Sequence, residues 1–340
     1  MRQDIKDYFE HAVFPFIAHE HPDVVPEMSV RVIGSVGLGL NDELSDMEAE
    51  ILLPAALWRQ QGGQLQLTLV HQLEPFSASS RAHCECPGDP FSWMHFGHPE
   101  IGVHPRSLEL AGQAEEVFAG KKDVPWGKIS VEKLFELQNH LILRDADGFL
   151  ARLRAVTAVE LYPKPLWVKR IIGELAGLKG EPWDLEKAVR RGRWLEAEMI
   201  LGSMLPTLLR LTFLINQRYY PWRKYLFAYL KDLPVIPSGL PDAFNVISSS
   251  GRWDDKVAAV NSILRILTEM MLDSGMVSTD MLEYLLDAKG AEAWQNPNWR
   301  EASDRRRRWA QEAGYDWLDG WIWGYWGWTG SDAESQRTER

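Results

Sequence analysis

The sequence has little cysteine and no long uninterrupted apolar run. Cys84 and Cys86 are the only two cysteines in 340 residues, too few for a disulfide framework and consistent with a reducing compartment. No uninterrupted apolar run reaches the roughly 18 residues that cross a bilayer. Residues 1–20 carry charges on both sides of a short apolar patch, unlike a signal peptide. We therefore expect a soluble, cytoplasmic protein without a membrane partner.

Positive charge is also scarce. Lys and Arg number 37 against 48 Asp and Glu, so the net charge is −11. This balance disfavours broad electrostatic binding of nucleic acid, although it leaves room for a local basic site. A hydrophobic content of 45% is enough for a substantial core, and the length predicts two domains at roughly 100–200 residues each.

Strand patterns occupy the first part of the chain, after a helical pattern over residues 5–17. Residues 28–33 are β-branched and end at glycine, and residues 47–53 follow a polar loop, which predicts two strands. Leu65, Leu67 and Leu69 alternate with other residues, which predicts a third strand over residues 65–70. Residues 74–106 are irregular, with one short strand near 101–104. These strands would form a small mixed sheet.

From about residue 130 the pattern becomes helical. Apolar residues over 131–141 share one helix face, and a turn follows at residues 145–148. The longest helix is predicted over residues 185–217 with a kink at Pro206, and another over 257–271 stops at Gly275. We expect an α+β chain: a small mixed-sheet domain over residues 1–125, an all-α helical bundle over 126–330, and a frayed polar tail over 331–340.

Acidic and apolar residues alternate along the second predicted strand. The strand period of two puts Asp46, Glu48 and Glu50 on one face, opposite an apolar face. Magnesium ions, which neutralise a triphosphate during nucleotidyl transfer, prefer such oxygen ligands. Upstream, Gly34 lets backbone amides approach a phosphate to which the Ser35 hydroxyl can donate. The strand alone is as compatible with a solvent-facing edge, but the glycine-serine turn favours a phosphate and metal site.

A second cluster of charge follows Pro221, which suits the first position of a new helix. Arg223 and Lys224 would then lie in the opening turn, where the helix dipole disfavours each cation by roughly 0.3–1 kcal/mol. Two adjacent cations at a helix start indicate a bound anion, and a triphosphate is the obvious one. A solvated helix face or pairing with carboxylates is the structural alternative.

These residues resemble a known family. The run Ile33-Gly34-Ser35, the spacer, and Ser45-Asp46-Met47-Glu48 are similar to the Gly-Ser and Asp-x-Asp/Glu signature of the DNA polymerase beta superfamily of nucleotidyltransferases. Residues 143–162 and 215–224 are similar to the helical domain of bacterial aminoglycoside nucleotidyltransferase-like proteins. The likeness covers much of residues 1–235, and the tryptophan-rich tail has no counterpart in it.

The resemblance implies the reaction and the roles of the residues. Asp46 and Glu48 would bind Mg²⁺, and Gly34 and Ser35 would bind the phosphates of the nucleotide. The expected reaction transfers a nucleoside monophosphate, AMP from ATP, to a hydroxyl acceptor such as an aminoglycoside-like small molecule. Lys224 corresponds to the family's helical-domain lysine and would stabilise the leaving pyrophosphate. Arg218 and Arg223 would lie behind it, in a cleft between the two domains.

The sequence differs from the family in its third carboxylate. Many members add one from a later strand, as a metal ligand or as the base that deprotonates the acceptor. The predicted strand 65–70 has no acid, so Glu74, Glu85 and Glu100 are the nearby candidates. Glu50 is a poorer candidate because it lies about 7 Å along the strand from Glu48.

Two other classes of protein remain open. One is a toxin or antitoxin-type nucleotidyltransferase that modifies tRNA or a protein, although the net charge speaks against tRNA. The other is a catalytically degenerate nucleotide-binding protein, which the missing third acid suggests.

Three further features have weaker functional interpretations. Histidines and cysteines cluster over residues 83–104: His83, Cys84, Cys86, His95, His98 and His104. Their side chains are compatible with a zinc site, but their spacing matches no zinc motif, and histidines exposed on a surface loop are more common. Residues 305–308 are arginines flanked by acids, which predicts a charged helix face. Eight of the 16 tryptophans fall between Trp294 and Trp328, where they could stack on a ligand. More often such a cluster packs a core or forms a subunit interface of a homo-oligomer.

Overall fold

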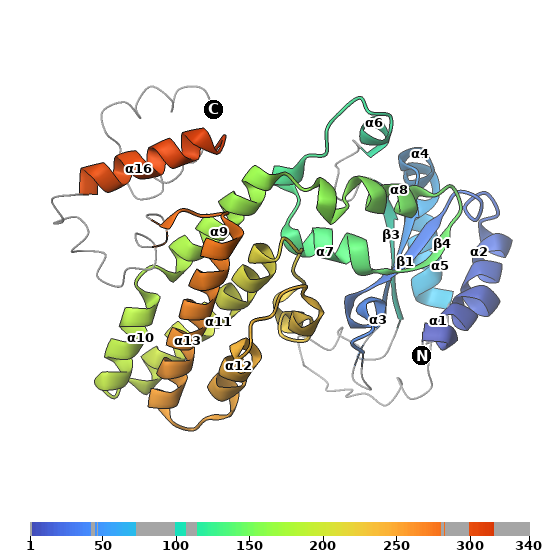
Figure 1. The fold of residues 1–340 in the computed structure, drawn as a ribbon. Coiled ribbons are helices and arrows are strands. Elements are labelled where there is room, and N and C mark those ends of the chain that lie inside the picture. The colour runs from blue at the N-terminus through green and yellow to red at the C-terminus, as the bar shows by residue number, and fades with distance from the viewer. Residues whose placement is uncertain are drawn as a thin grey trace, which may run out of the picture. The chain divides into compact units, whose positions relative to one another are not determined.

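The chain is an α+β protein, mostly helical, with one small mixed sheet. Its computed structural model describes residues 2–41, 45, 47–72, 99–106, 114–279, 282 and 299–315. The chain divides into two compact units, Met1–Leu161 and Tyr162–Arg340 (Figure 1). Residues 126–161, which the sequence assigned to the helical domain, thus lie in the first unit.

The first unit contains a four-stranded sheet with the strand order β3-β2-β1-β4. Its strands are β1 (Ser29–Ile33), β2 (Met47–Leu53), β3 (Pro99–Pro105) and β4 (Leu141–Asp145). Strand β1 is antiparallel to both β2 and β4, whereas β2 and β3 are parallel, so the sheet is mixed as expected. The helical elements of this unit are α1 (Arg2–Tyr8), η1 (Phe9–Val13), α2 (Phe14–Glu20), α3 (Gly34–Leu38), α4 (Ala55–Leu57), η2 (Trp58–Gly62), α5 (Gly63–Gln72), α6 (Ala114–Phe118), η4 (Trp126–Lys128), α7 (Val131–Asn139), α8 (Phe149–Val156) and η5 (Val159–Leu161).

The two faces of the sheet differ in chemistry. Apolar residues from β1, β2 and β3 form one core with the N-terminal helices and α5; this core includes Val30, Val32, Ala49, Ile51 and Ile101. The intervening positions of β1 and β2 carry Arg31 and Glu50, and Arg31 contacts Glu136 of α7. Helices α1 and α2 thus lie on the side of the sheet opposite α7 (Figure 1). The alternation expected along residues 47–51 is confirmed.

The strand predicted over residues 65–70 is wrong, because these residues belong to helix α5. Leu65 and Leu69 are 0% and 4% exposed whereas Leu67 is 55% exposed, which is the i, i+4 burial of a helix and not the period of a strand. A run of leucines at every second position satisfies both patterns, so the alternation could not discriminate between them. Strand β3, predicted near residues 101–104, is the neighbour of β2 instead. Strand β4 was missed because its first residue, Leu141, also fitted the face of the preceding helix.

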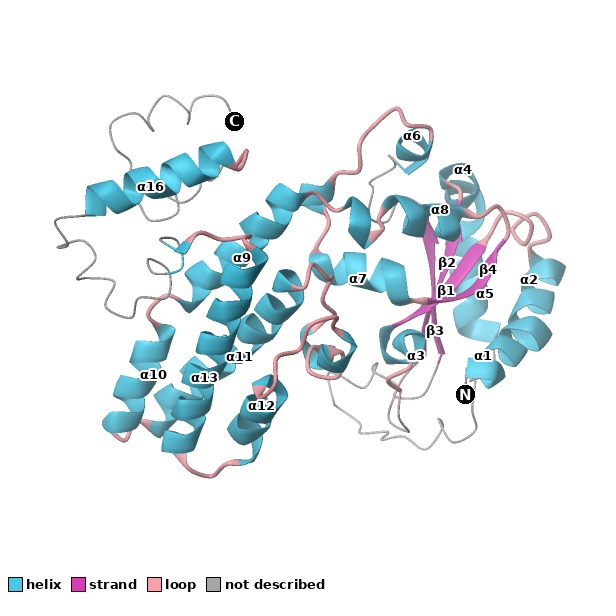
Figure 2. Cartoon of the chain, viewed as in Figure 1, coloured by secondary structure: helices cyan, strands magenta, loops and turns pink. Residues whose placement is uncertain are grey.

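The described part of the second unit contains helices and loops without strands (Figure 2). Its elements are α9 (Lys164–Leu178), α10 (Glu181–Arg190), α11 (Trp194–Ile215), η6 (Arg223–Tyr225), η7 (Leu230–Asp232), α12 (Leu240–Ser249), α13 (Trp253–Ser274) and α16 (Trp299–Glu312). The single helix predicted over residues 185–217 is two helices, because Gly192 takes a left-handed φ of 66° between them. Pro206 lies inside α11, and α13 ends at Gly275 as predicted, with φ 62°.

Helix α11 is long and apolar enough to cross a membrane, and no other helix in the described ranges meets that test. The sequence does not show α11 as an uninterrupted apolar run, because the charged residues Glu196, Glu198 and Arg210 interrupt it. Half of its most apolar 18-residue window is buried inside the protein. Core helices of soluble proteins pass the same test, and α11 packs against α9, α10 and α13.

The arginine run is part of α16, and two of its members pair with acids on the same helix. Arg305 contacts Glu301 at 3.2 Å and Arg307 contacts Asp304 at 3.9 Å, and these arginine side chains are exposed. The predicted charged helix face is confirmed. Trp309 packs against Tyr315 with ring centroids 5.7 Å apart. The later tryptophans of the tail, and the predicted frayed end, lie outside the described residues.

Two glycines should respond oppositely to alanine. A Cβ on Gly37 would lie 2.2 Å from the backbone oxygen of Val32, so α3 can pack on β1 only with glycine there. Gly37→Ala should therefore lower the free energy of unfolding by about 1–3 kcal/mol or more. Gly63→Ala is the control, since its Cβ would meet nothing within 4 Å at helical φ and ψ, and we expect a gain of about 0.5–1 kcal/mol. Urea unfolding of both variants tests this, and a Gly37→Ala protein as stable as wild type would contradict the close packing.

Candidate active site

Gly34 and Glu48 meet where β1 ends. Ile33 and Glu48 are paired positions of β1 and β2, and Gly34 follows directly with a left-handed φ of 63°. A Cβ on Gly34 would lie 2.7 Å from Oε2 of Glu48, so the carboxylate lies over the glycine. The left-handed backbone conformation favours glycine at this position, and a Cβ there would make the end of the Glu48 side chain shift.

Ser35 follows Gly34 in a helix, not in a simple turn. The two residues begin α3, a short helix that packs against β1 and β2. Both are partly accessible, whereas Val36 and Gly37 are buried in the same helix. The order of strand, glycine, serine and short helix therefore puts Gly34 and Ser35 at the accessible start of α3, beside the carboxylate of Glu48.

The first acid of the predicted pair, Asp46, lies outside the described residues, and its metal-binding role stays a prediction. Met47 begins β2 with its side chain buried, and Glu48 follows with its side chain half-buried. Glu50, two positions further, is buried against Arg31 at 2.6 Å. Glu50 therefore has a structural partner of its own, in agreement with its low rank as a third acid.

Glu100 stands beside Glu48 in the sheet. The parallel ladder between β2 and β3 pairs the Cα of Glu48 with the Cα of Glu100, and adjacent strands run about 4.8 Å apart. Of the three candidates for the third carboxylate, Glu74 and Glu85 lie outside the described residues. Glu100 was among the candidates from the sequence, but the pattern did not rank it first, because it predicts the next strand over residues 65–70.

The donor chemistry at this position fits a hard cation. The carboxylate oxygens of Glu48 are of the type that Mg²⁺ takes, and the backbone position of Glu100 is in register with Glu48. Within the described ranges, no group of three or more His, Cys, Asp or Glu side chains is arranged to hold a metal. Asp46, one of the two predicted ligands, lies outside these ranges, and so do residues 83–98, which carry five of the six possible zinc ligands.

The predicted helix after Pro221 is much shorter than expected. It is the single 3₁₀ turn η6, which begins at Arg223 after Trp222. One turn has little macrodipole, so the dipole argument for an anion at this point does not hold. Arg218, Arg223 and Lys224 are nevertheless exposed. They belong to the second unit, whereas Gly34, Ser35 and Glu48 lie together in the first.

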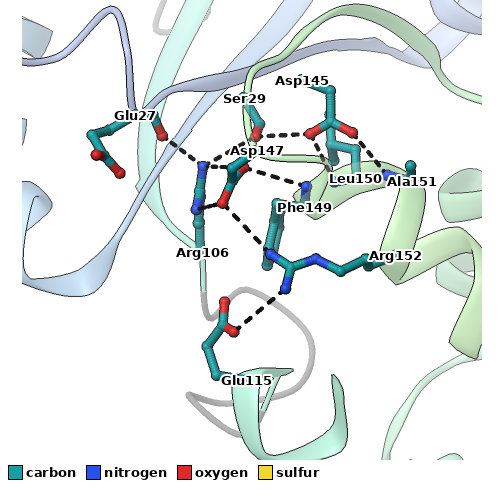
Figure 3. Close-up of polar contacts among 10 residues, drawn as sticks. All are labelled: Glu27, Ser29, Arg106, Glu115, Asp145, Asp147, Phe149, Leu150, Ala151 and Arg152. Carbon is teal, nitrogen blue, oxygen red and sulfur yellow. Dashed lines mark hydrogen bonds and ion pairs between the residues drawn. The ribbon is translucent and has the colours of Figure 1, made fainter. Parts of the chain in front are cut away.

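A dense polar network occupies the opposite end of the sheet, roughly 16 Å along β1 from Gly34. Arg106, just after β3, donates to both oxygens of Asp147 at 2.5 and 2.7 Å and to the backbone oxygen of Glu27 at 2.6 Å (Figure 3). Asp145 accepts from the Ser29 hydroxyl and from two backbone N–H groups in the first turn of α8. Asp145 and Asp147 therefore cap α8 and join it to β1 and β3, which is a structural role.

A known family model matches the middle of the chain. Residues 126–226 match a family model described as a domain of unknown function, DUF4037. The match runs from η4 to η6 and includes Asp145, Asp147 and Lys224, but not Gly34 or Glu48. No curated protein matches the sequence.

A methyl group at Gly34 should disturb the position of Glu48. Gly34→Ala places a Cβ 2.7 Å from Oε2 of Glu48, so that this oxygen must shift, and adds a strain of about 1–2 kcal/mol from the left-handed conformation. We expect a loss of Mn²⁺ affinity of at least about tenfold, measured by calorimetry with Mn²⁺ as the Mg²⁺ substitute. Gly148→Ala is the control, because it has a similar φ of 72° and open space at its Cβ. Equal Mn²⁺ affinity in the two variants would contradict the contact.

Proposed function

We propose that this protein is a magnesium-dependent nucleotidyltransferase that transfers AMP from ATP to a hydroxyl acceptor. The observation that carries the proposal is the junction of β1, α3 and β2, where the carboxylate of Glu48 lies over Gly34. Glu100, in register with Glu48, supplies the position of a further acid on the neighbouring strand. A small mixed sheet with Glu48 and the position of Glu100 at the same end is compatible with a nucleotidyltransferase domain of the polymerase beta type, with a helical bundle after it.

The roles of the residues follow from their chemistry. Asp46 and Glu48 would hold Mg²⁺, which when bound neutralises the triphosphate and aligns the reacting oxygens. Gly34 and Ser35 would bind phosphate through the backbone amide and the hydroxyl. Glu100 would complete the acidic set or take the proton from the acceptor hydroxyl as it attacks the α-phosphate, with pyrophosphate leaving.

The exposed cations of the second unit are the candidate contacts to the leaving group. Lys224 would stabilise charge on the pyrophosphate, supported by Arg218 and Arg223. The acceptor is proposed to be a small hydroxyl compound such as an aminoglycoside, in the cytoplasm. A nucleic-acid partner is disfavoured by the net charge of −11.

The direct test follows the α-phosphate. Purified protein is incubated with Mg²⁺ and ATP labelled at the α-phosphate, together with aminoglycosides, with total RNA, or with cell protein. We expect pyrophosphate release and label on a small molecule, with both lost in Asp46→Ala. Label on tRNA or protein would overturn the small acceptor and favour the toxin-type alternative. ATP binding by calorimetry without pyrophosphate release under any mixture would overturn the enzyme and favour a degenerate nucleotide-binding protein.

A further inference from the structure

A fully buried arginine lies behind the proposed metal site. Arg31, in the middle of β1, is 1% exposed. Its Nε donates to Oε2 of Glu50 at 2.6 Å, and Nη2 contacts the same oxygen at 2.5 Å. Arg31 and Glu50 are paired across β1 and β2, and the next pair on the same face of the sheet is Ile33 with Glu48.

The same guanidinium extends to the helix that covers this face. Nη2 of Arg31 lies 3.7 Å from Oε1 of Glu136 on α7, and Lys133 contacts that oxygen at 2.6 Å. His140, at the end of α7, stays neutral, because burial and then the charge of Arg31 lower its pKa from 6.5 to about 2. Arg31 thus ties β1, β2 and α7 together with two carboxylates, close to one end of β2.

Such a cluster is not the most stable solution for a protein interior. Removing two charges from water costs several kcal/mol per ion, and an apolar pair of similar volume is often equally stable or more stable. Among the described residues, Nη1 of Arg31 also has no hydrogen-bond partner although it is buried, which adds a cost of about 1–3 kcal/mol. An ion pair, unlike an apolar pair, has a directional geometry, and this geometry specifies one arrangement of the strands.

We infer that Arg31 is a positioning residue for the metal-binding carboxylate, acting through Glu50 to fix β2 against α7. This inference rests on the proposed function. Glu48 is held on two sides: Gly34 leaves the space for its carboxylate, and the Arg31–Glu50 contact fixes the strand two residues further. Slippage of β2 by a fraction of an ångström would move Glu48 off Gly34.

The double removal of Arg31 and Glu50 separates positioning from simple electrostatics. A cation near a metal site repels the metal and a carboxylate attracts it, so removing both together leaves the local net charge unchanged, and charge alone predicts little change in metal binding. A positioning role predicts weaker binding instead. Outer partners of metal ligands typically change metal affinity by about 10–100-fold when they are altered.

The test uses the double variant Arg31→Met with Glu50→Leu, because an apolar pair keeps the core filled and leaves no unpaired charge. We expect cooperative thermal unfolding near the wild-type temperature and Mn²⁺ affinity, by calorimetry, at least about tenfold weaker. Arg31→Lys is the second variant; it keeps the charge but loses the planar fork, and it should also weaken Mn²⁺ binding. It covers the case in which the double variant does not fold.

The matched control is the ion pair between Arg210 and Glu174, which is two-pronged at 2.7 and 2.8 Å and joins α11 to α9. Arg210→Met with Glu174→Leu should leave Mn²⁺ affinity unchanged. Wild-type or stronger Mn²⁺ binding in folded Arg31→Met, Glu50→Leu, or wild-type binding in Arg31→Lys, would overturn the inference. Absence of Mn²⁺ binding by the wild-type protein would instead refute the proposed function on which the inference rests.

Discussion

A Glu48→Gln variant is expected to release pyrophosphate from ATP at least about a thousandfold more slowly than the wild-type protein. The substitution keeps the shape of the side chain over Gly34 and removes one negative oxygen ligand. The charge stabilisation that a bound metal supplies is worth several kcal/mol, and each 1.36 kcal/mol corresponds to a factor of ten in rate. The rate should be measured at saturating Mg²⁺ with the acceptor that becomes labelled.

The control for this prediction is Glu196→Gln, which neutralises an exposed carboxylate on α11 and should leave the rate unchanged. Thermal unfolding should be the same for wild type, Glu48→Gln and the control, so that a rate loss reports on the site. A Glu48→Gln protein within about tenfold of the wild-type rate would show that Glu48 does not bind the catalytic metal.

An Arg31→Met variant is expected to lose about 3–5 kcal/mol of unfolding free energy, because it leaves a buried carboxylate without its cation. Glu50 is 9% exposed and has Arg31 as its ion-pair partner, whereas Glu136 keeps Lys133. The loss should be measured by urea unfolding at neutral pH.

The comparison with Arg31→Met, Glu50→Leu makes this stability prediction specific. The double variant should recover most of the lost free energy, because no unpaired charge remains in the core. A double variant as unstable as Arg31→Met would show that the space left by the arginine, and not the isolated charge of Glu50, causes the loss.

Secondary structure was predicted correctly where the residue pattern fits only one kind of element. Residues 29–33 and 47–53 are strands because β-branched or alternating residues fit a pleated, half-buried surface. Gly275 ends α13 because glycine takes the left-handed φ without strain. The prediction of secondary structure failed where the residue pattern fits both a strand and a helix. Leu65, Leu67 and Leu69 fit a strand or one turn of a helix, and the burial of Leu65 and Leu69 decided for the helix.

The same distinction holds for the candidate site. Gly34 and Glu48 were predicted to share one site because they lie at the ends of two strands that are close in the sequence. The structure brings these two residues together. Glu100 could not be ranked above Glu74 or Glu85, since 52 residues separate it from Glu48 and a parallel neighbour is joined by a long crossover. Arg223 and Lys224 after Pro221 are exposed, but they lie in a single 3₁₀ turn and not in the helix predicted for them, and their phosphate-binding role stays a prediction.

The sequence by itself determined the α+β class and the apolar and acidic faces of β2. These depend on residues within a few positions of one another, where backbone geometry dictates which side chains share a face. The tertiary structure alone decided that Glu100 stands beside Glu48, and that Arg31 pairs with Glu50 while reaching Glu136. Such contacts join residues from distant segments, and strand pairing with burial selects them where local patterns leave several partners equally compatible.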